Sequence, residues 1–242
     1  MLAWHDERMA RPRIVVLTGA GISAESGVAT FRDAGGLWEG HSVEDVATPE
    51  GFARDPDTVL RFYDERRRAV ASVPPNPAHV ALARLEAFVG DELLVITQNV
   101  DDLHERAGTR NLVHMHGELA RALCAGCGTR PEWSTDLIDR PACPRCGDRM
   151  LRPDVVWFGE MPYGLDRIED AVFGCDIFVS IGTSGEVYPA AGYVALATAG
   201  GAWTIELNLE PSAAAVPFDD VRRGLASVLV PAWVDEQLAG RT

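Results

Sequence analysis

Short runs of branched apolar residues recur along this chain of 242 residues, and stretches with helical patterning separate them. The runs are bounded by Gly, Asp or Asn and cover residues 14–17, 93–97, 112–114, 177–181, 204–207 and 227–230. Alternating strands and helices are typical of a parallel sheet covered by helices on both faces. The sequence therefore predicts an α/β, Rossmann-like fold, with helices at 189–199 and 232–238.

Two stretches interrupt this alternation. Residues 37–75 read as short helices around 44–45, 49–53 and 57–71, and residues 118–159 hold two cysteine pairs and few apolar runs. We expect residues 1–36, 76–117 and 160–242 to form a Rossmann-like domain. The helical insertion and the cysteine-containing module would pack together as a small domain, and a cleft between the two is the expected ligand site.

The charge balance excludes several classes of function. Lys and Arg number 22 against 36 Asp and Glu, a net charge of −14, and all 22 cations are Arg. This balance argues against nucleic-acid binding and against docking on an anionic membrane. The sequence has no long apolar run and no secretory signal, so a cytoplasmic protein is expected, starting at Met1 or Met9.

Four of the five cysteines are paired as C-x2-C-x15-C-x2-C, at Cys124, Cys127, Cys143 and Cys146. Thiols stay reduced in the cytoplasm, so this spacing predicts a zinc site rather than two disulfides. Four thiolates close the coordination shell, which predicts a structural ion. Cys175 stands alone and is expected to be a small buried apolar residue.

A glycine-rich segment, TGAGISAESG at residues 18–27, follows the first predicted strand. Gly19 and Gly21 permit a tight turn, and a helix N-terminus behind it favours a phosphate group. The third glycine, Gly27, comes later than in the dehydrogenase fingerprint, so this segment alone is a weak signal.

Polar residues cluster after two further strands. The segment TQNVDDLH at 97–104 lies where ligands of parallel sheets bind, although Asn99 or Asp101 alone could equally cap a helix. His114 and His116 flank a third strand end. Alternation predicts that both point to one side of that strand, and a histidine there is often structural.

Together these features resemble the sirtuins, NAD-dependent protein-lysine deacylases, over nearly the whole chain. The matching motifs run in family order: GAGISAESG, TQNVDDLH, the HG pair, the cysteine pairs, RPDVVWFGE at 152–160, GTS at 182–184 and NLE at 208–210. Asp102 and Gly185 depart slightly from the usual residues. More narrowly, the chain looks like the bacterial class III deacylases.

The resemblance implies that NAD is consumed, with nicotinamide, O-acyl-ADP-ribose and free lysine as products. It implies His116 as general base, with Asn99 and Asp101 also catalytic. Ala20 and Arg32 would contact phosphates or ribose, and Phe31 would shield the nicotinamide pocket. The implied NAD contacts are Gly19, Ala20, Gly21, Ile22, Ala24, Glu25, Phe31, Arg32, Trp38, Gln98, Asn99, Val100, Asp101, Gly182, Thr183, Ser184, Asn208, Leu209, Glu210 and Ala226.

The resemblance also implies where the acylated lysine binds. Val156, Trp157, Phe158 and Gly159 would pair with the substrate as an added strand. Tyr63 and Arg66 stand three apart on a predicted helix, and from the pattern alone a solvated face with Arg66–Arg68 paired to acidic neighbours is favoured. The class III signature implies instead that they bind succinyl, malonyl or glutaryl groups, with Ala47 leaving room.

Three rival interpretations fit the sequence less well. An ADP-ribosyltransferase would use the same NAD site, a dehydrogenase would reduce NAD, and a binding module would hold ADP-ribose without chemistry. The sequence leaves the target proteins and the oligomeric state undefined.

Overall fold

The computed structural model describes residues 11–28, 37–38 and 40–239. Six parallel strands form one sheet in the order β10-β9-β8-β1-β4-β5. Their bounds are β1 (Ile14–Thr18), β4 (Leu93–Thr97), β5 (Leu112–His114), β8 (Ile177–Ile181), β9 (Trp203–Asn208) and β10 (Asp220–Arg223). The chain winds outward from β1 to β5 and then returns to β8 on the other side of β1. The winding therefore reverses between β1 and β8, where doubly wound sheets bind ligands.

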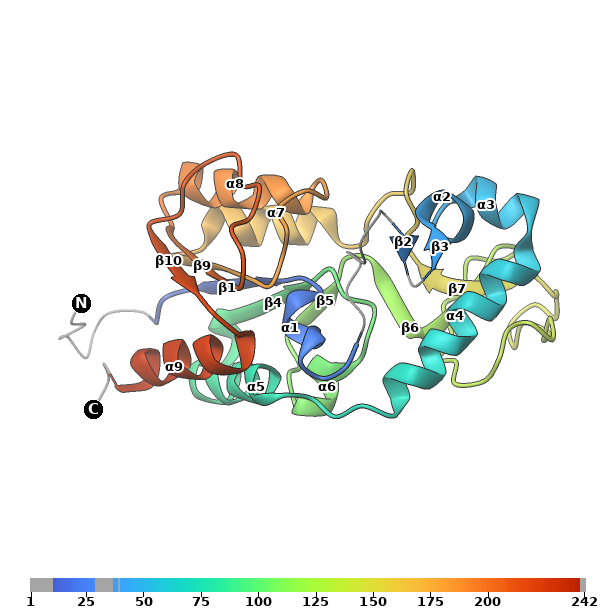
Figure 1. Cartoon of the computed structure of the whole chain (residues 1–242), viewed down its shortest axis with the longest axis horizontal. Helices are drawn as coiled ribbons and strands as arrows, with labels where there is room; N and C mark the ends of the chain where they lie inside the picture. Colours follow the sequence, from blue (N-terminus) through green and yellow to red (C-terminus); the bar gives the residue numbers. More distant parts are fainter. Residues whose placement is uncertain (1–10, 29–36, 39, 240–242) are drawn as a thin grey trace.

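Helices cover both faces of the sheet, as the sequence predicts (Figure 1). In β1, Ile14 and Val16 pack toward α5 (Pro77–Val89) and α9 (Ala226–Ala239), while Val15 and Leu17 pack toward α7 (Leu165–Gly174) and α8 (Tyr193–Gly200). This alternation is why the strands read as continuous apolar runs. Shorter helices are α1 (Gly21–Ala24), η1 (Gly90–Glu92), α6 (Leu103–Ala107) and η2 (Ala190–Gly192).

A second group of elements lies beyond the carboxyl ends of the strands, at the right of Figure 1. It contains β2 (Leu37–Trp38), β3 (His41–Ser42), α2 (Val43–Val46), α3 (Pro49–Arg54), α4 (Pro56–Ala71), β6 (Gly117–Cys124) and β7 (Leu151–Val155). Strands β6 and β7 pair antiparallel. Asp64 of α4 joins the two halves of this group, because its carboxylate accepts hydrogen bonds from the backbone amides of Leu137 and Ile138 and from Arg67.

The prediction of a strand at residues 227–230 is wrong, because these residues form the first turns of α9. The buried positions Ala226, Val230, Trp233 and Val234 follow helical spacing, and Val228 is 63% exposed. The sixth strand is instead β10, whose exposed Arg223 suits the edge of a sheet.

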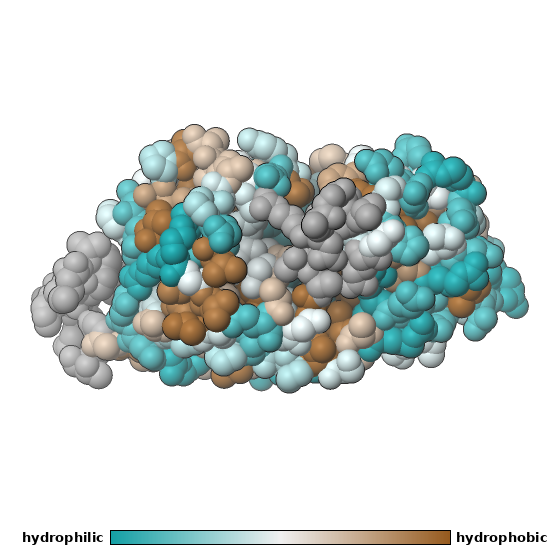
Figure 2. Space-filling model, in the orientation of Figure 1, coloured by the Kyte–Doolittle hydropathy of each residue, from teal (hydrophilic) through white to brown (hydrophobic). Residues whose placement is uncertain are grey.

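The face shown in Figure 2 is mostly hydrophilic over α4 and carries an apolar patch where α9 begins. Leu225 and Val228 are exposed there. Within the described ranges, every helix is too short or too polar to cross a membrane.

Candidate active site

A cavity of about 750 Å³ opens at the carboxyl ends of β1, β4 and β8, between the sheet and the second group of elements. This size is typical of sites for cofactors and drug-sized ligands. Residues from the sheet loops form one wall, and Ala47, Tyr63 and Trp157 belong to the opposite one. The cavity therefore lies where the sequence predicts the cleft.

Backbone packed against backbone forms the floor of the cavity between β1 and β8. Gly19 and Gly21 donate hydrogen bonds to the carbonyl oxygens of Ile181 and Gly182. A Cβ atom on Gly21 would lie 2.7 Å from Cα of Gly182, and one on Gly182, whose φ is +59°, would lie 2.5 Å from the amide nitrogen of Ile22. The glycines of this turn are therefore required by the scaffold itself, and α1 behind it is a single turn.

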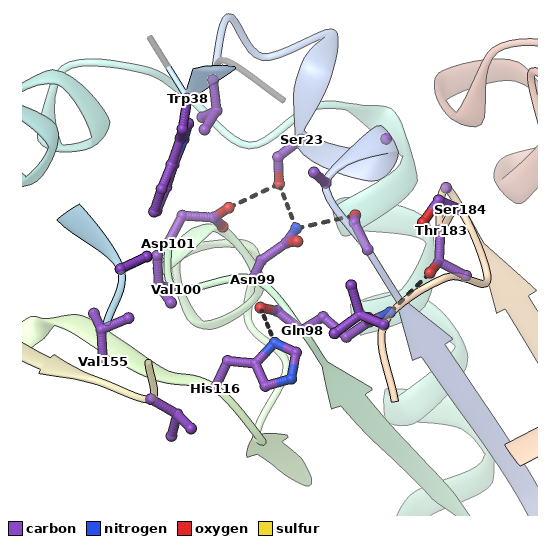
Figure 3. A pocket seen from close by; sticks show the side chains of 18 of the residues that line it. Ser23, Trp38, Gln98, Asn99, Val100, Asp101, His116, Val155, Thr183 and Ser184 are labelled. Carbon is purple, nitrogen blue, oxygen red and sulfur yellow. Dashed lines mark hydrogen bonds between the residues drawn. The ribbon is translucent and has the colours of Figure 1, made fainter. Parts of the chain in front are cut away.

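The loop after β4 brings three predicted residues into one network, drawn in Figure 3. The Asn99 amide donates to the carbonyl oxygen of Gly19 and to Ser23 Oγ, both at 3.1 Å. Ser23 then donates to Asp101 Oδ2 at 3.0 Å. Gln98 donates from the same loop to Thr183 Oγ1 at 2.9 Å. Both amide protons of Asn99 are therefore used within the chain, and its Oδ1 atom is the acceptor that remains for a ligand.

Asp101 supports its own loop and also lines the cavity. Its Oδ1 atom accepts the amide proton of Leu103, the first residue of α6, whose N-cap is Asp102. Burial raises the pKa of the Asp101 carboxyl, and the hydrogen bonds from Leu103 and Ser23 oppose this.

One buried histidine, His79, supports this loop and was missed in the sequence. His79 Nε2 lies 3.4 Å from Ser23 Oγ, and its Nδ1 atom accepts the amide proton of Asn76, so the ring donates to Ser23. Burial lowers the pKa of His79 to about 4, which keeps the ring neutral. Ser23 links His79 to Asn99 and Asp101. Because Ser23 belongs to the glycine-rich motif, it was the one residue of this network that the sequence could have pointed to.

His116 lies below Gln98 in Figure 3, at the edge of the cavity. Its Nδ1 atom is 3.1 Å from the carbonyl oxygen of Gln98. A carbonyl only accepts, so Nδ1 carries the proton and Nε2 keeps its lone pair. Burial lowers the pKa of His116, and the bond to Gln98 opposes this. The ring is thus held as a neutral base.

His114 has a different environment from His116, and only His116 lines the cavity. Strand β5 ends at His114, and alternation does not continue to His116. The ring of His114 bonds the carbonyl oxygen of Asn99 at 3.0 Å and Glu105 at 2.7 Å. His114 therefore holds the loop after β4 through the Asn99 carbonyl, which is the structural role common for a histidine at a strand end.

Tyr63 and Arg66 line the cavity on one face of α4 and are 0% and 8% exposed, so the solvated-face interpretation is wrong for them. The Arg66 guanidinium stacks on the ring of Phe62, with 3.2 Å between its central carbon and the ring centroid. The expected acidic pairing holds for Arg67, which binds Asp64. Ala47 lies on the cavity wall nearby.

The segment Val156–Gly159 also lines the cavity, but much of its backbone is already bonded. The amides of Val156 and Phe158 donate to the carbonyl oxygens of His116 and Ala47, and that of Trp157 donates to Glu160. An added strand would therefore have to use the amide of Gly159 and carbonyl oxygens.

Most other predicted NAD contacts border the cavity: Ala20, Trp38, Val100, Thr183, Ser184, Asn208, Leu209 and Glu210. Four predicted residues do not line it. Ile22 and Ala226, the first residue of α9, are buried in the same core cluster. Ala24 is exposed, and the Glu25 carboxylate accepts the amide proton of Ser227. Phe31 and Arg32 lie outside the described residues.

Several cavity residues carried no signal in the sequence. The clearest are Glu186, Val187 and Tyr188, which follow the GTS motif and line the cavity. An isolated glutamate, valine and tyrosine in a loop have no spacing that marks them.

The four paired cysteines fit one zinc ion. Their sulfur atoms lie within 4.8 Å of one another, at 3.7 Å for Cys124 and Cys146 and 3.9 Å for Cys127 and Cys143. Four sulfurs bound tetrahedrally at about 2.3 Å from zinc are roughly 3.8 Å apart, far beyond a disulfide bond. The four cysteines close the coordination shell and none of them lines the cavity, as a structural ion requires. Cys175 is buried beside Val172, as expected.

Comparisons with known proteins agree with this geometry. The Sir2 family model matches residues 19–189. An NAD-dependent protein deacylase of Salmonella typhimurium is 55% identical over 97% of this chain and 87% of its own length. One of Pasteurella multocida is 56% identical over 93% of this chain and 98% of its own.

A solved structure of a Sir2 homologue in complex with NAD superposes with a TM-score of 0.86. It is 39% identical and covers 98% of this chain and 96% of its own. The doubly wound sheet, the four-cysteine zinc module and the cavity between them define a Rossmann-like, NAD-dependent class of protein. Within that class, this chain belongs to the Sir2 family.

Proposed function

We propose that this chain removes acidic acyl groups, succinyl and malonyl, as well as acetyl, from lysine side chains of proteins. The coarse activity follows from the family: the chain is an NAD-dependent protein deacylase. The overall reaction takes acyl-lysine, NAD and water to free lysine, nicotinamide and O-acyl-ADP-ribose.

The cavity offers a separate environment for each end of NAD. The loops after β8 and β9, with Ser184, Asn208 and Glu210, supply polar groups for the adenosine end. Asn99 and Asp101 supply a buried amide oxygen and a carboxylate for the nicotinamide end. When bound, NAD supplies an electrophilic ribose carbon from which nicotinamide departs.

His116 acts as the general base. Its protonated Nδ1 is bonded to Gln98, so Nε2 accepts a proton from a ribose hydroxyl of the cosubstrate. Gln98 itself is held by Thr183, which ties the base to the loop after β8. The neutral state favoured by burial is the one a base needs.

The acyl class rests on one observation: a phenol and a guanidinium lie together, buried, on the cavity wall. Tyr63 and Arg66 lie one turn apart on α4, and both line the cavity. A donor and a cation side by side favour a carboxylate, and Ala47 keeps the wall open beside them. An acetyl group offers no charge to this pair.

We also propose the division of the chain given by the sequence. Residues 1–36, 76–117 and 160–242 would form the NAD-binding domain, and 37–75 with 118–159 the small domain. The single six-stranded sheet and the Asp64 bonds from α4 to Leu137 support it. The cytoplasmic location and the lack of nucleic-acid or membrane partners stay predictions.

Mass spectrometry of matched acetyl-, succinyl- and malonyl-lysine peptides, incubated with the protein and NAD, tests the proposal. We expect loss of the acidic acyl groups with formation of O-acyl-ADP-ribose. Loss of acetyl alone would leave a deacylase and overturn the acyl class. Release of nicotinamide without any deacylation would favour the alternative, a protein ADP-ribosyltransferase.

A further inference from the structure

A buried hydrogen bond joins the two walls of the acyl pocket. The indole nitrogen of Trp157, which follows β7, lies 3.0 Å from the hydroxyl oxygen of Tyr63 on α4. Trp157 is 3% exposed and Tyr63 is 0% exposed, so water cannot substitute for either group. The bond is therefore shielded from water.

The direction of this bond is fixed by chemistry. An indole nitrogen is a donor only, so the Tyr63 oxygen must be the acceptor. The proton of Tyr63 then has to point elsewhere, and no acceptor oxygen among the described residues takes it. Burial raises the pKa of Tyr63 far above neutrality, so the proton is always present.

Two side chains of the RPDVVWFGE motif, Arg152 and Glu160, hold the indole in place. The Arg152 guanidinium stacks on the Trp157 ring, with 4.0 Å between its central carbon and the ring centroid. Glu160 accepts Arg152 NH2 at 2.7 Å through one oxygen and the Trp157 amide at 2.9 Å through the other. One carboxylate thus fixes both the backbone and the ring of Trp157.

We infer that Trp157 is a positioning residue for acyl specificity, which forces the Tyr63 hydroxyl to act as a hydrogen-bond donor into the pocket. A permanent donor beside Arg66 suits an acceptor-only group, the terminal carboxylate of an acidic acyl chain. This inference rests on the proposed acyl class. It gives the side chains of the RPDVVWFGE motif a role in acyl specificity, separate from the pairing of its backbone with the substrate.

A double-mutant cycle on succinyl-lysine peptide tests it. Trp157→Phe removes the donor and keeps an aromatic ring, and we expect KM to rise about 3- to 10-fold, the scale of one hydrogen bond. Tyr63→Phe removes the hydroxyl that Trp157 acts on. In the Tyr63→Phe background, Trp157→Phe should therefore change KM less than 2-fold.

The outcomes separate this inference from the proposed function. If the unmodified protein removes no succinyl groups, the acyl class fails. If it does, but Trp157→Phe raises KM equally in both backgrounds, the indole acts only through packing and the inference is overturned. Should Trp157→Phe not fold, a benzothienyl analogue at position 157 keeps the shape and lacks the N–H. It must then give the same coupling with Tyr63→Phe.

Discussion

The Nδ1 atom of His116 donates to the carbonyl oxygen of Gln98 over 3.1 Å, joining the candidate base to the loop after β4. The bond selects one tautomer of a ring that otherwise has two. It leaves Nε2 as the proton acceptor.

His116→Ala is therefore expected to lower kcat/KM for acyl peptide by about 10²- to 10⁴-fold, because a positioned base contributes on that scale. Steady-state assays of nicotinamide release with acyl peptide measure it. Added imidazole should restore part of the rate if the loss is one of proton transfer. Turnover equal to that of the unmodified protein would remove His116 from the chemistry.

The pH profile of kcat/KM should report a lowered pKa. Burial lowers the pKa of His116 from its usual 6.5, so the neutral ring persists as the pH falls, and the acidic limb should lie below pH 6.5. Burial raises the pKa of Asp101, which titrates on the same side. The limb belongs to His116 only if it is missing from the residual activity of His116→Ala. A limb above 6.5 would contradict the assignment.

Arg66→Met should reduce desuccinylation about 10- to 100-fold relative to deacetylation, because a charge-assisted hydrogen bond is lost. The ratio of kcat/KM for matched peptides is the measurement. Arg68→Met is the matched control, since Arg68 lies on the same helix but points to Asp136 at the surface. An equal fall of both activities in Arg66→Met would make Arg66 a structural residue.

Gly182→Ala should destabilise the protein more than Gly201→Ala. Both glycines have positive φ, which costs a side-chain residue about 1–2 kcal/mol, but a Cβ on Gly201 meets nothing within 4 Å. A Cβ on Gly182 would lie 2.5 Å from the Ile22 amide. Urea unfolding measures the free energy of unfolding of both variants. Gly201→Ala reports the cost of backbone strain alone, and Gly182→Ala reports strain together with the steric clash. Equal free energies of unfolding would mean that the contact yields without cost.

Loss of zinc should unfold the cysteine module and loosen α4. Cys127→Ser removes one of the four thiolate ligands and is expected to lose the zinc ion, whose binding contributes about 10–16 kcal/mol in small domains. Hydrogen exchange should then rise in residues 118–155 and, through the Asp64 bonds, in α4. Cys175→Ala, whose thiol is buried away from the cluster, should still hold one zinc per chain by native mass spectrometry. A stable α4 in the zinc-free variant would mean that Asp64 does not transmit the loss.

The sequence predicted the buried strands well, because strands covered on both faces are continuous apolar runs. Residues 93–97, 112–114 and 177–181 are strands at the expected bounds. The run at 227–230 was misread because branched residues favour strands, while the helical spacing of Ala226, Val230 and Trp233 extends beyond it. Strand β10 was missed, since its residues are mostly charged.

The candidate site was predicted where residue type alone carries the chemistry. The cysteines, the loop after β4 and His116 are of this kind. Contacts between residues far apart in the sequence could not be predicted. The Trp157–Tyr63 bond spans 94 positions, and Glu25 binds Ser227, which is 202 positions away in the sequence. Such contacts depend on packing between elements that no local pattern encodes.

The contact between the turns after β1 and β8 has a consequence for evolution. Gly21 and Gly182 are fixed by the collision of two backbones, whatever ligand lies above them. A descendant that lost its base and its acyl pocket but kept its fold would still need both glycines. The presence of both glycines in a relative would thus indicate only that the fold is kept. Residues such as His116 would distinguish an active enzyme from an inactive one.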